Sequence, residues 1–447
     1  MKLKISITVI LIISIGFFCI AEENGETLTI EQIRLLALSN SRVLSKYNLN
    51  IESYILNEKA QNYRNLPSFS LGGSAGGTLW GGDTNIPERY DAGANISLSQ
   101  KIWDGGRNSV MNSINKLSTD IARKEALQEY FRVLDAADAA YYGVLEAKTA
   151  LDAAAAMLEV SQIGLEIAQI RHESGVISVG DYLRAVAENE SQRTNQNLAR
   201  RDLLLSMARL RSITGFRGTP MLQEIDFENY ETIIQKLSEL TYIEVDKIIS
   251  VFLETIYTNN PLLERSALLS RRADRSVALA TREYFPNINL GISTGMTYNN
   301  IYGTENSPGR ITISGNIPLD LWVIRNNVQN KQLAQQQAVL DHTETELALD
   351  IEIQSGILNF IAQASTVISS RRALEYSNKQ LENKMELYRL ASASISEVSD
   401  AVASVSSNQN HLIRAQYSFL RSLSVIRSLG AFDSEEQILA LMQHGWN

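Results

Sequence analysis

Four short stretches alternate apolar and polar residues. They cover residues 68–80, 90–103, 287–298 and 310–319. A period of two predicts strands with two chemically different faces. Each stretch is close to the 9–11 residues that a tilted strand needs to cross a membrane.

Two much longer stretches carry apolar residues at heptad spacing. In residues 104–171 and 321–389 this spacing predicts helices of about 100 Å each, packed as coiled coils. All seven prolines lie outside residues 104–215 and 319–447, so no proline there interrupts a helix. The first predicted stripe is Leu127, Tyr130, Leu134, Ala137, Tyr141, Val144, Leu151, Ala155, Leu158 and Leu165. The second is Ile353, Ile357, Phe360, Ala364, Val367, Leu374, Leu381, Met385 and Tyr388.

The chain contains an internal repeat. Residues 66–71 resemble 285–290, residues 171–178 match 389–396 at a spacing of 218, and residues 211–215 match 427–430. Each half predicts a helix, a proline, two strands, a very long helix, a break and a shorter helix. We therefore expect a first repeat at 22–215, a linker region at 216–260, a second repeat at 261–432 and a tail at 433–447.

Composition excludes several classes of function. The formal charge is −9, with 41 Lys plus Arg against 50 Asp plus Glu, so the chain has no basic footprint for nucleic acid. One cysteine and four histidines, far apart in sequence, argue against a Cys/His metal site and thiol catalysis. No Ser/His/Asp grouping or Gly-rich phosphate loop stands out. We predict no catalytic residues, no metal and no cofactor.

The N-terminus has the features of an export signal. Lys2 and Lys4 precede the apolar run 5–18, and Cys19 and Ala21 stand at the −3 and −1 positions of a cleavage site. Residues 1–21 are therefore predicted to be a signal peptide. The alternative is that Cys19 is the lipidated first residue of a lipoprotein. After residue 21 no run approaches the ~18 apolar residues of a spanning helix, so any membrane crossing must use strands.

Strands in lipid must close into a barrel, because every backbone group needs a partner. Common barrels have at least eight strands, and this chain supplies four. We therefore expect a homotrimer with a shared twelve-stranded barrel. The residues expected to face lipid are Ile96, Leu98, Ile288, Leu290, Ile311 and Ile313. The other interpretation of the helices, a periplasmic coiled-coil spacer without a pore, leaves these strands unexplained.

Several motifs resemble those of the TolC-like outer-membrane efflux proteins. They are Arg171, Gly175, Ser178, Asp181 and Ile213–Gly215, together with Trp103–Gly106 after the second strand and Leu28–Gln32 in the first helix. The resemblance implies a mainly α-helical trimeric channel-tunnel in the outer membrane, with an α-barrel through the periplasm. It also implies a periplasmic adaptor and an inner-membrane transporter as partners. The implied activity is passive export of small toxic molecules or polypeptides by efflux or type I secretion.

The resemblance also suggests roles for the two helix breaks. The adaptor is expected to dock at Gly175, Val176, Ser178, Ala393, Ser394 and Ser396; the alternative is that these residues only form tight turns. A gate is expected from Glu397 and Asp400, with Asp181 supporting it through a hydrogen bond to Arg389. The alternative for the two acids is stabilisation of a helix N-terminus. The alignment of the two halves places Ala393 at the family's turn glycine and predicts that about two residues are missing before Glu397.

Overall fold

The computed structural model describes residues 27–78, 89–218 and 220–446, with side chains as far as Met442. The predicted signal peptide, with Cys19, and Trp80 at the end of the first predicted strand lie outside the described residues. The chain forms two compact units. The sheet unit comprises Lys46–Ala126 and Leu262–Glu346, and the helical unit comprises Met1–Ser45, Leu127–Pro261 and Leu347–Asn447.

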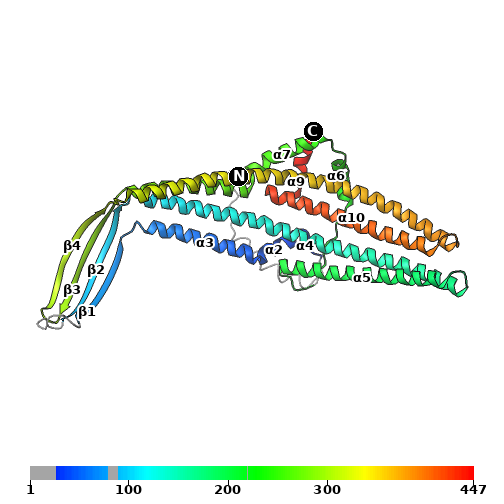
Figure 1. Cartoon of the computed structure of the whole chain (residues 1–447), viewed down its shortest axis with the longest axis horizontal. Coiled ribbons are helices and arrows are strands. Elements are labelled where there is room, and N and C mark those ends of the chain that lie inside the picture. The colour runs from blue at the N-terminus through cyan, green and yellow to red at the C-terminus, as the bar shows by residue number, and fades with distance from the viewer. Residues whose placement is uncertain (1–26, 79–88, 219, 447) are drawn as a thin grey trace. The chain divides into compact units, whose positions relative to one another are not determined.

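The sheet unit contains one antiparallel sheet of four strands in the order β1-β2-β3-β4 (Figure 1). The strands are β1 (Ser68–Thr78), β2 (Arg89–Trp103), β3 (Asn287–Asn299) and β4 (Gly303–Asn316). Helix α3 (Arg42–Tyr63) leads into β1, and α8 (Pro261–Thr281) with the short 3₁₀ turn η1 (Arg282–Tyr284) leads into β3. The long helices α4 (Arg107–Glu173) and α9 (Leu321–Arg389) begin after β2 and β4. The predicted order of elements is therefore observed in both halves.

The fourth strand was placed wrongly from the sequence. It was expected at 310–319, after Pro308, but β4 begins at Gly303 and ends at Asn316. Ser293 pairs with Arg310 while Gly295 pairs with Ser307, so the chain bulges at Pro308. An edge strand with a bulge accepts a proline, because its missing N–H is not needed in the ladder.

The connection between β2 and α4 is short and held by several hydrogen bonds. The Asp104 carboxylate accepts hydrogen bonds from the backbone N–H groups of Gly106 and Asn108, both at 3.0 Å. Gly105 has φ of +67°, and a Cβ there would lie 2.5 Å from Cβ of Phe285. The Arg107 guanidinium donates to the carbonyl oxygens of residues 282, 283 and 285 at 2.7–3.1 Å. These contacts fix the start of α4 against the turn that precedes β3.

The described part of the helical unit contains the remaining parts of α4 and α9, with six further helices. They are α2 (Ile30–Asn40), α5 (Val179–Thr214), α6 (Glu228–Ser238), α7 (Tyr242–Asn259), α10 (Ile395–Gly430) and α11 (Glu435–Trp446). A capping box between Thr29 and Gln32 starts α2. None of the described helices is both long and apolar enough to span a membrane.

The heptad stripe of α9 is confirmed. Seven of its nine residues are buried, and Leu374 and Met385 are partly buried. The buried ones are Ile353, Ile357, Phe360, Ala364, Val367, Leu381 and Tyr388. The stripe of α4 is confirmed only in part, because Leu127 is 37% exposed while Phe131, Tyr142 and Leu145, outside the stripe, are buried. Helix α4 lies between α5 and α10, which flank a groove with α4 as its third wall. Contacts on two sides make its buried face wider than a single coiled-coil seam.

A buried ionic network joins four helices of this unit. The side chain of Asp138 on α4 is fully buried. It contacts Arg34 of α2 at 2.6 Å and Arg427 of α10 at 2.5 Å. Arg34 also contacts Glu435 of α11 at 3.0 Å. Burial and the neighbouring Asp138 raise the pKa of Asp135. The network fixes both ends of the described chain to α4 and α10.

Candidate membrane sheet and helix-break site

One face of the sheet is apolar and exposed. Residues paired across antiparallel strands point to the same side, and the register aligns Phe69, Leu98, Ile292 and Ile311. The next apolar row along β3 pairs Leu290 with Ile313. All six residues predicted to face lipid lie on this face. Phe69, Ile311 and Ile313 are 71–77% exposed, so nothing described in this chain covers them.

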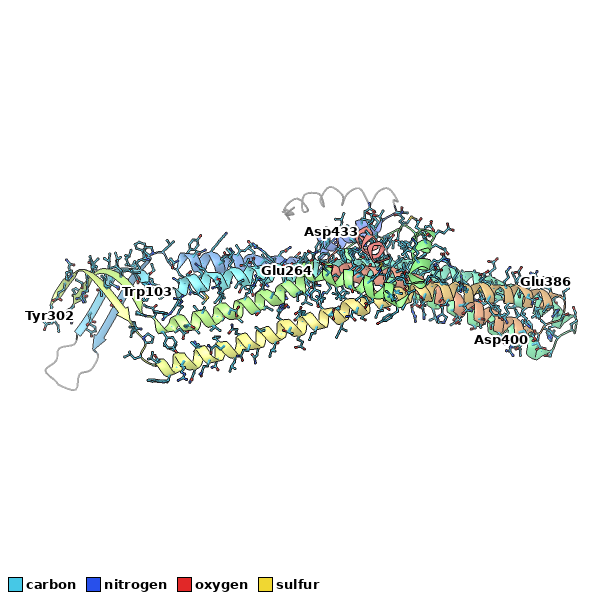
Figure 2. All side chains as sticks on the ribbon, turned by 90° about the horizontal axis from the view of Figure 1, so that it is seen from above. Trp103, Glu264, Tyr302, Glu386, Asp400 and Asp433 are labelled. Atoms are coloured by element: carbon cyan, nitrogen blue, oxygen red, sulfur yellow. The ribbon has the colours of Figure 1, made fainter. Side chains whose placement is uncertain are left out.

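Aromatic side chains border the apolar face at both ends. Trp103 pairs with Ile288 at the end near the helices, and its ring lies edge-on to that of Phe285 at 6.2 Å. Tyr298 pairs with Ala92 toward the opposite end of the strands, and Tyr302 also lies at that end of the sheet (Figure 2). The distance from Ile288 to Tyr298 is about 33 Å along the strand at ~3.3 Å per residue, or about 25 Å after a ~40° tilt. That matches the apolar band of a membrane barrel with its aromatic girdles.

The opposite face of the sheet is polar. Ser70, Ser97, Ser293 and Arg310 form one row across the four strands, and the Ser70 and Ser97 hydroxyls lie 2.6 Å apart. The contrast between the faces is the one expected of a strand with lipid on one side and water on the other.

The two helix breaks have the same backbone geometry. At the first, Gly175 has φ of +73° and the N–H of Val176 donates to the carbonyl of Arg171 at 2.8 Å. At the second, Ala391 has φ of +61° and the N–H of Ser392 donates to the carbonyl of Leu387 at 2.8 Å. Both are Schellman-type helix ends.

The equivalence of the breaks therefore needs correction. The sequence comparison placed Ala393 opposite Gly175, at a spacing of 218. The structure places Ala391 there, at a spacing of 216, the same spacing that relates Ser178 to Ser394. The spacing of 216 thus holds from the turn to the cap, and no two residues are missing before Glu397. A left-handed alanine gives no signal in the sequence, because glycine is the usual marker of this conformation.

The serines of the breaks are helix caps. The Ser178 hydroxyl accepts from the N–H of Asp181 at 3.1 Å, and the Ser394 hydroxyl accepts from the N–H of Glu397 at 3.3 Å. The exposed apolar residue of the first break is Val176, at 62%. At the second break it is Leu390, at 66%, whereas Ile395 beside Ser394 and Ser396 is buried. Leu390 was missed because it lies before the turn.

Both breaks pack on one hydrophobic cluster. Met157 and Ala168 of α4, Ala185 of α5, Leu381 and Tyr388 of α9, and Ile395, Val398, Ala401, Val402 and Val405 of α10 form it. The Arg171 guanidinium donates to the Tyr388 carbonyl at 2.5 Å and lies over the Tyr388 ring at 4.5 Å. Burial raises the pKa of the Tyr388 hydroxyl, and Arg171 opposes that shift. Arg171 and Tyr388 thus connect the ends of the two long helices.

The predicted gate acids lie near basic residues of the same chain. Glu397 accepts from Lys384 at 3.1 Å, and Asp400 lies 3.9 Å from Arg184. Glu386 and Asp400 are near each other at this end of the helical unit (Figure 2). The expected bond between Asp181 and Arg389 is not formed within the chain. Asp181 accepts from the Ser178 hydroxyl at 2.8 Å, and Arg389 lies 3.9 Å from Glu386 one helical turn away.

Comparison with known proteins identifies the family. The outer membrane efflux protein family matches residues 34–216 and 253–430, which is most of the chain. The chain belongs to this family. Outer membrane efflux proteins are transport proteins and not enzymes, which confirms the sequence-based prediction. The predicted localisation in the outer membrane is confirmed as well.

Relatives and solved structures agree with this assignment. TolC of Salmonella enteritidis is 22% identical over 392 residues, covering 84% of this chain and 76% of TolC. The CmeC outer membrane channel of Campylobacter jejuni superposes with a TM-score of 0.74 at 14% identity, covering 93% of this chain and 89% of CmeC. VceC of Vibrio cholerae gives 0.72 at 15% identity, covering 90% and 96%. The fold of outer membrane efflux proteins is therefore present.

Proposed function

We propose that the protein is the outer-membrane channel-tunnel of a tripartite efflux or type I secretion system. Three copies form a twelve-stranded barrel, and their long helices form the wall of a periplasmic tunnel. Transport through it is passive, from an inner-membrane transporter to the outside, and carries small toxic molecules or polypeptides.

The observation that carries this proposal is the two-faced sheet with open edges. Its apolar face has the height of a bilayer core and aromatic borders. Among the described residues, its edge strands β1 and β4 each have a partner on one side only. Open edges are not tolerated in lipid, so further copies must supply the missing partners. A coiled-coil spacer without a pore would not need an exposed apolar sheet.

Two measurements on the purified protein test the channel. Light scattering in detergent should give the mass of three chains, and reconstitution in a planar lipid bilayer should give discrete conductance steps. A monomer, or a trimer that does not conduct, would contradict the proposal.

The helix breaks are proposed to contact the periplasmic adaptor. Val176 and Leu390 expose apolar side chains beside the caps Ser178 and Ser394, which suits a small hydrophobic contact with a helical hairpin. Cysteine at Val176 or Ser394 should crosslink to the cognate adaptor in cells. Cysteine at the exposed Glu159, about four turns before the end of α4, serves as the control. Crosslinks from Glu159→Cys alone would contradict docking at the breaks.

The gate is proposed to be two rings of carboxylates from Glu397 and Asp400. Threefold symmetry would bring six acids to one opening, favouring cations and a bound divalent ion. Lys384 and Arg184 reduce that charge, so the selectivity should be moderate. Replacing both acids by alanine should weaken cation selectivity and divalent block in bilayer recordings. Replacing the exposed Glu386 by alanine should change neither, and equal effects would exclude the rings.

A further inference from the structure

The charged residues of the strands gather on the polar face of the sheet. Among the strand residues whose side chains the structure describes, the charged ones are Asp91, Lys101, Glu305 and Arg310. In the same order, the register aligns them with Asn299, Asn289, Thr297 and Ser293 of β3. All four β3 residues belong to the polar face, so none of these charges lies on the face expected to meet lipid.

The charges are also sorted by sign along the strands. Strands β2 and β4 run in the same direction, because each pairs antiparallel with β3, and each is followed by a long helix. On both strands the acid comes first and the base follows, from Asp91 to Lys101 on β2 and from Glu305 to Arg310 on β4. The two bases therefore lie nearer the helices, and the two acids lie nearer the opposite end of the sheet.

The acids are too far away to compensate the bases. The rows of Arg310 and Glu305, which contain Ser293 and Thr297 of β3, are about 13 Å apart at ~3.3 Å per residue. The Debye length at physiological ionic strength is about 8 Å. Lys101 and Arg310 are both exposed, and neither forms an ion pair with another of the described residues. The part of the polar face near the helices is therefore positively charged.

The residues paired beside the two bases are short and polar. They are Ser70, Ser97 and Ser293 in the row of Arg310, and Asn289 and Ser314 in the row of Lys101. Short neighbours leave the two long side chains accessible to a molecule that passes over this face. The Arg310 guanidinium can hold two oxygens of a carboxylate or phosphate at once, while the Lys101 ammonium binds as a point charge.

We propose that Lys101 and Arg310 form a binding site for anionic groups, carboxylates or phosphates, of the transported molecule inside the barrel. The inference rests on the proposed channel, in which the polar face lines the passage. Threefold symmetry turns each base into a ring, so the part of the barrel near the helices attracts anions. These rings oppose the preference for cations that the proposed gate acids Glu397 and Asp400 create.

Bilayer recordings on the full-length protein test the site. The double variant Lys101→Gln/Arg310→Gln should raise the permeability ratio of K⁺ to Cl⁻, measured from the reversal potential in a KCl gradient. Inorganic pyrophosphate should block the unmodified channel. The concentration that halves the current should rise at least about fivefold in the double variant, the factor that one unit charge at ~4 Å contributes in water. Glu397 and Asp400 are unchanged, so the differences report on the barrel.

The matched control is Lys101→Arg/Arg310→Lys, which changes both residues and keeps both charges. Its permeability ratio should equal that of the unmodified channel. The two single variants, Lys101→Gln and Arg310→Gln, are recorded as well. Each should weaken the pyrophosphate block, so the test does not depend on insertion of the double variant. Lumen-facing substitutions of this kind are tolerated by membrane barrels.

The outcomes separate the anion site from the channel. A higher preference for cations and a weaker block in the neutral variants, with an unchanged ratio in the control, support the site. Neutral variants that conduct with the selectivity and block of the unmodified channel overturn the site alone. An equal change of the ratio in the control also overturns it, because charge would not be the cause. An unmodified protein that does not conduct overturns both the site and the proposed function.

Discussion

Replacing Asp138 should destabilise the helical unit more than any exposed substitution on α4. The carboxylate is fully buried and accepts two hydrogen bonds from Arg34, at 2.6 and 3.0 Å, and one from Ser424 at 3.0 Å. It also contacts Arg427, which is 2% exposed. Asp138→Asn keeps the shape but removes the carboxylate that pairs with the buried Arg427, while Arg34 keeps its contact with Glu435. Losing one partner of a buried ion pair costs about 3–5 kcal/mol.

The assay is guanidinium unfolding of detergent-purified protein, followed by the circular dichroism of its helices. Asp138→Asn should lower the free energy of unfolding by about 3–5 kcal/mol. Asp152→Asn, an exposed change on the same helix, should stay within about 0.5 kcal/mol. Adding Arg427→Met to Asp138→Asn should restore part of the loss, because one uncompensated charge is removed. A loss below about 1 kcal/mol for Asp138→Asn would refute the reasoning.

Three further substitutions have defined outcomes. Leu290→Arg, on the apolar face between the interface and the midplane, should destabilise the inserted protein by about 1–2 kcal/mol and reduce the amount recovered in outer membranes. Asn289→Arg on the polar face should do neither. The reverse result would mean that the two faces of the sheet are assigned the wrong way round. Gly105→Ala should lower thermal stability by about 1–3 kcal/mol more than Gly106→Ala. Both positions have positive φ, but an added Cβ meets a neighbour only at the first, so equal losses would contradict the contact. Ala391→Gly should raise the free energy of unfolding by about 0.5–1 kcal/mol. The substitution relieves left-handed strain of about 1–2 kcal/mol, which exceeds the cost of the entropy that glycine adds to the unfolded chain. A lower midpoint of thermal unfolding would contradict the strain at Ala391.

The periodic elements could be predicted from the sequence because their physical cause is local. Alternation placed three strands within a few residues, and the heptad stripe of α9 matched the buried side chains. The fourth strand was misplaced because its placement followed the alternation in residues 310–319, whereas β4 begins at Gly303 and passes Pro308 in a bulge. Ala391 escaped detection because its left-handed conformation is imposed by the turn and not by its side chain.

The partners of the charged residues were less predictable. Lys384 and Arg184 lie on two different helices, and only their packing against α10 brings them to Glu397 and Asp400. Arg171 was noted as a motif residue, but its contact with the Tyr388 ring spans 217 residues of sequence. Such pairings depend on how helices pack, which the order of residues in each helix does not specify.

The open edges of the sheet also have a consequence for biogenesis. In the part of the chain that the structure describes, strands β1 and β4 end the ladder with unpaired backbone groups, so these residues alone do not close the sheet. The rate at which the proposed barrel forms should therefore rise more steeply than in proportion to chain concentration. The folding of a self-contained domain has no such dependence. Before the proposed assembly forms, each chain exposes two unpaired edge strands and an apolar sheet face, which can associate with other chains. The time spent in that state, and not the final stability of the assembly, should limit the yield of inserted protein when expression is low or when a chaperone is missing.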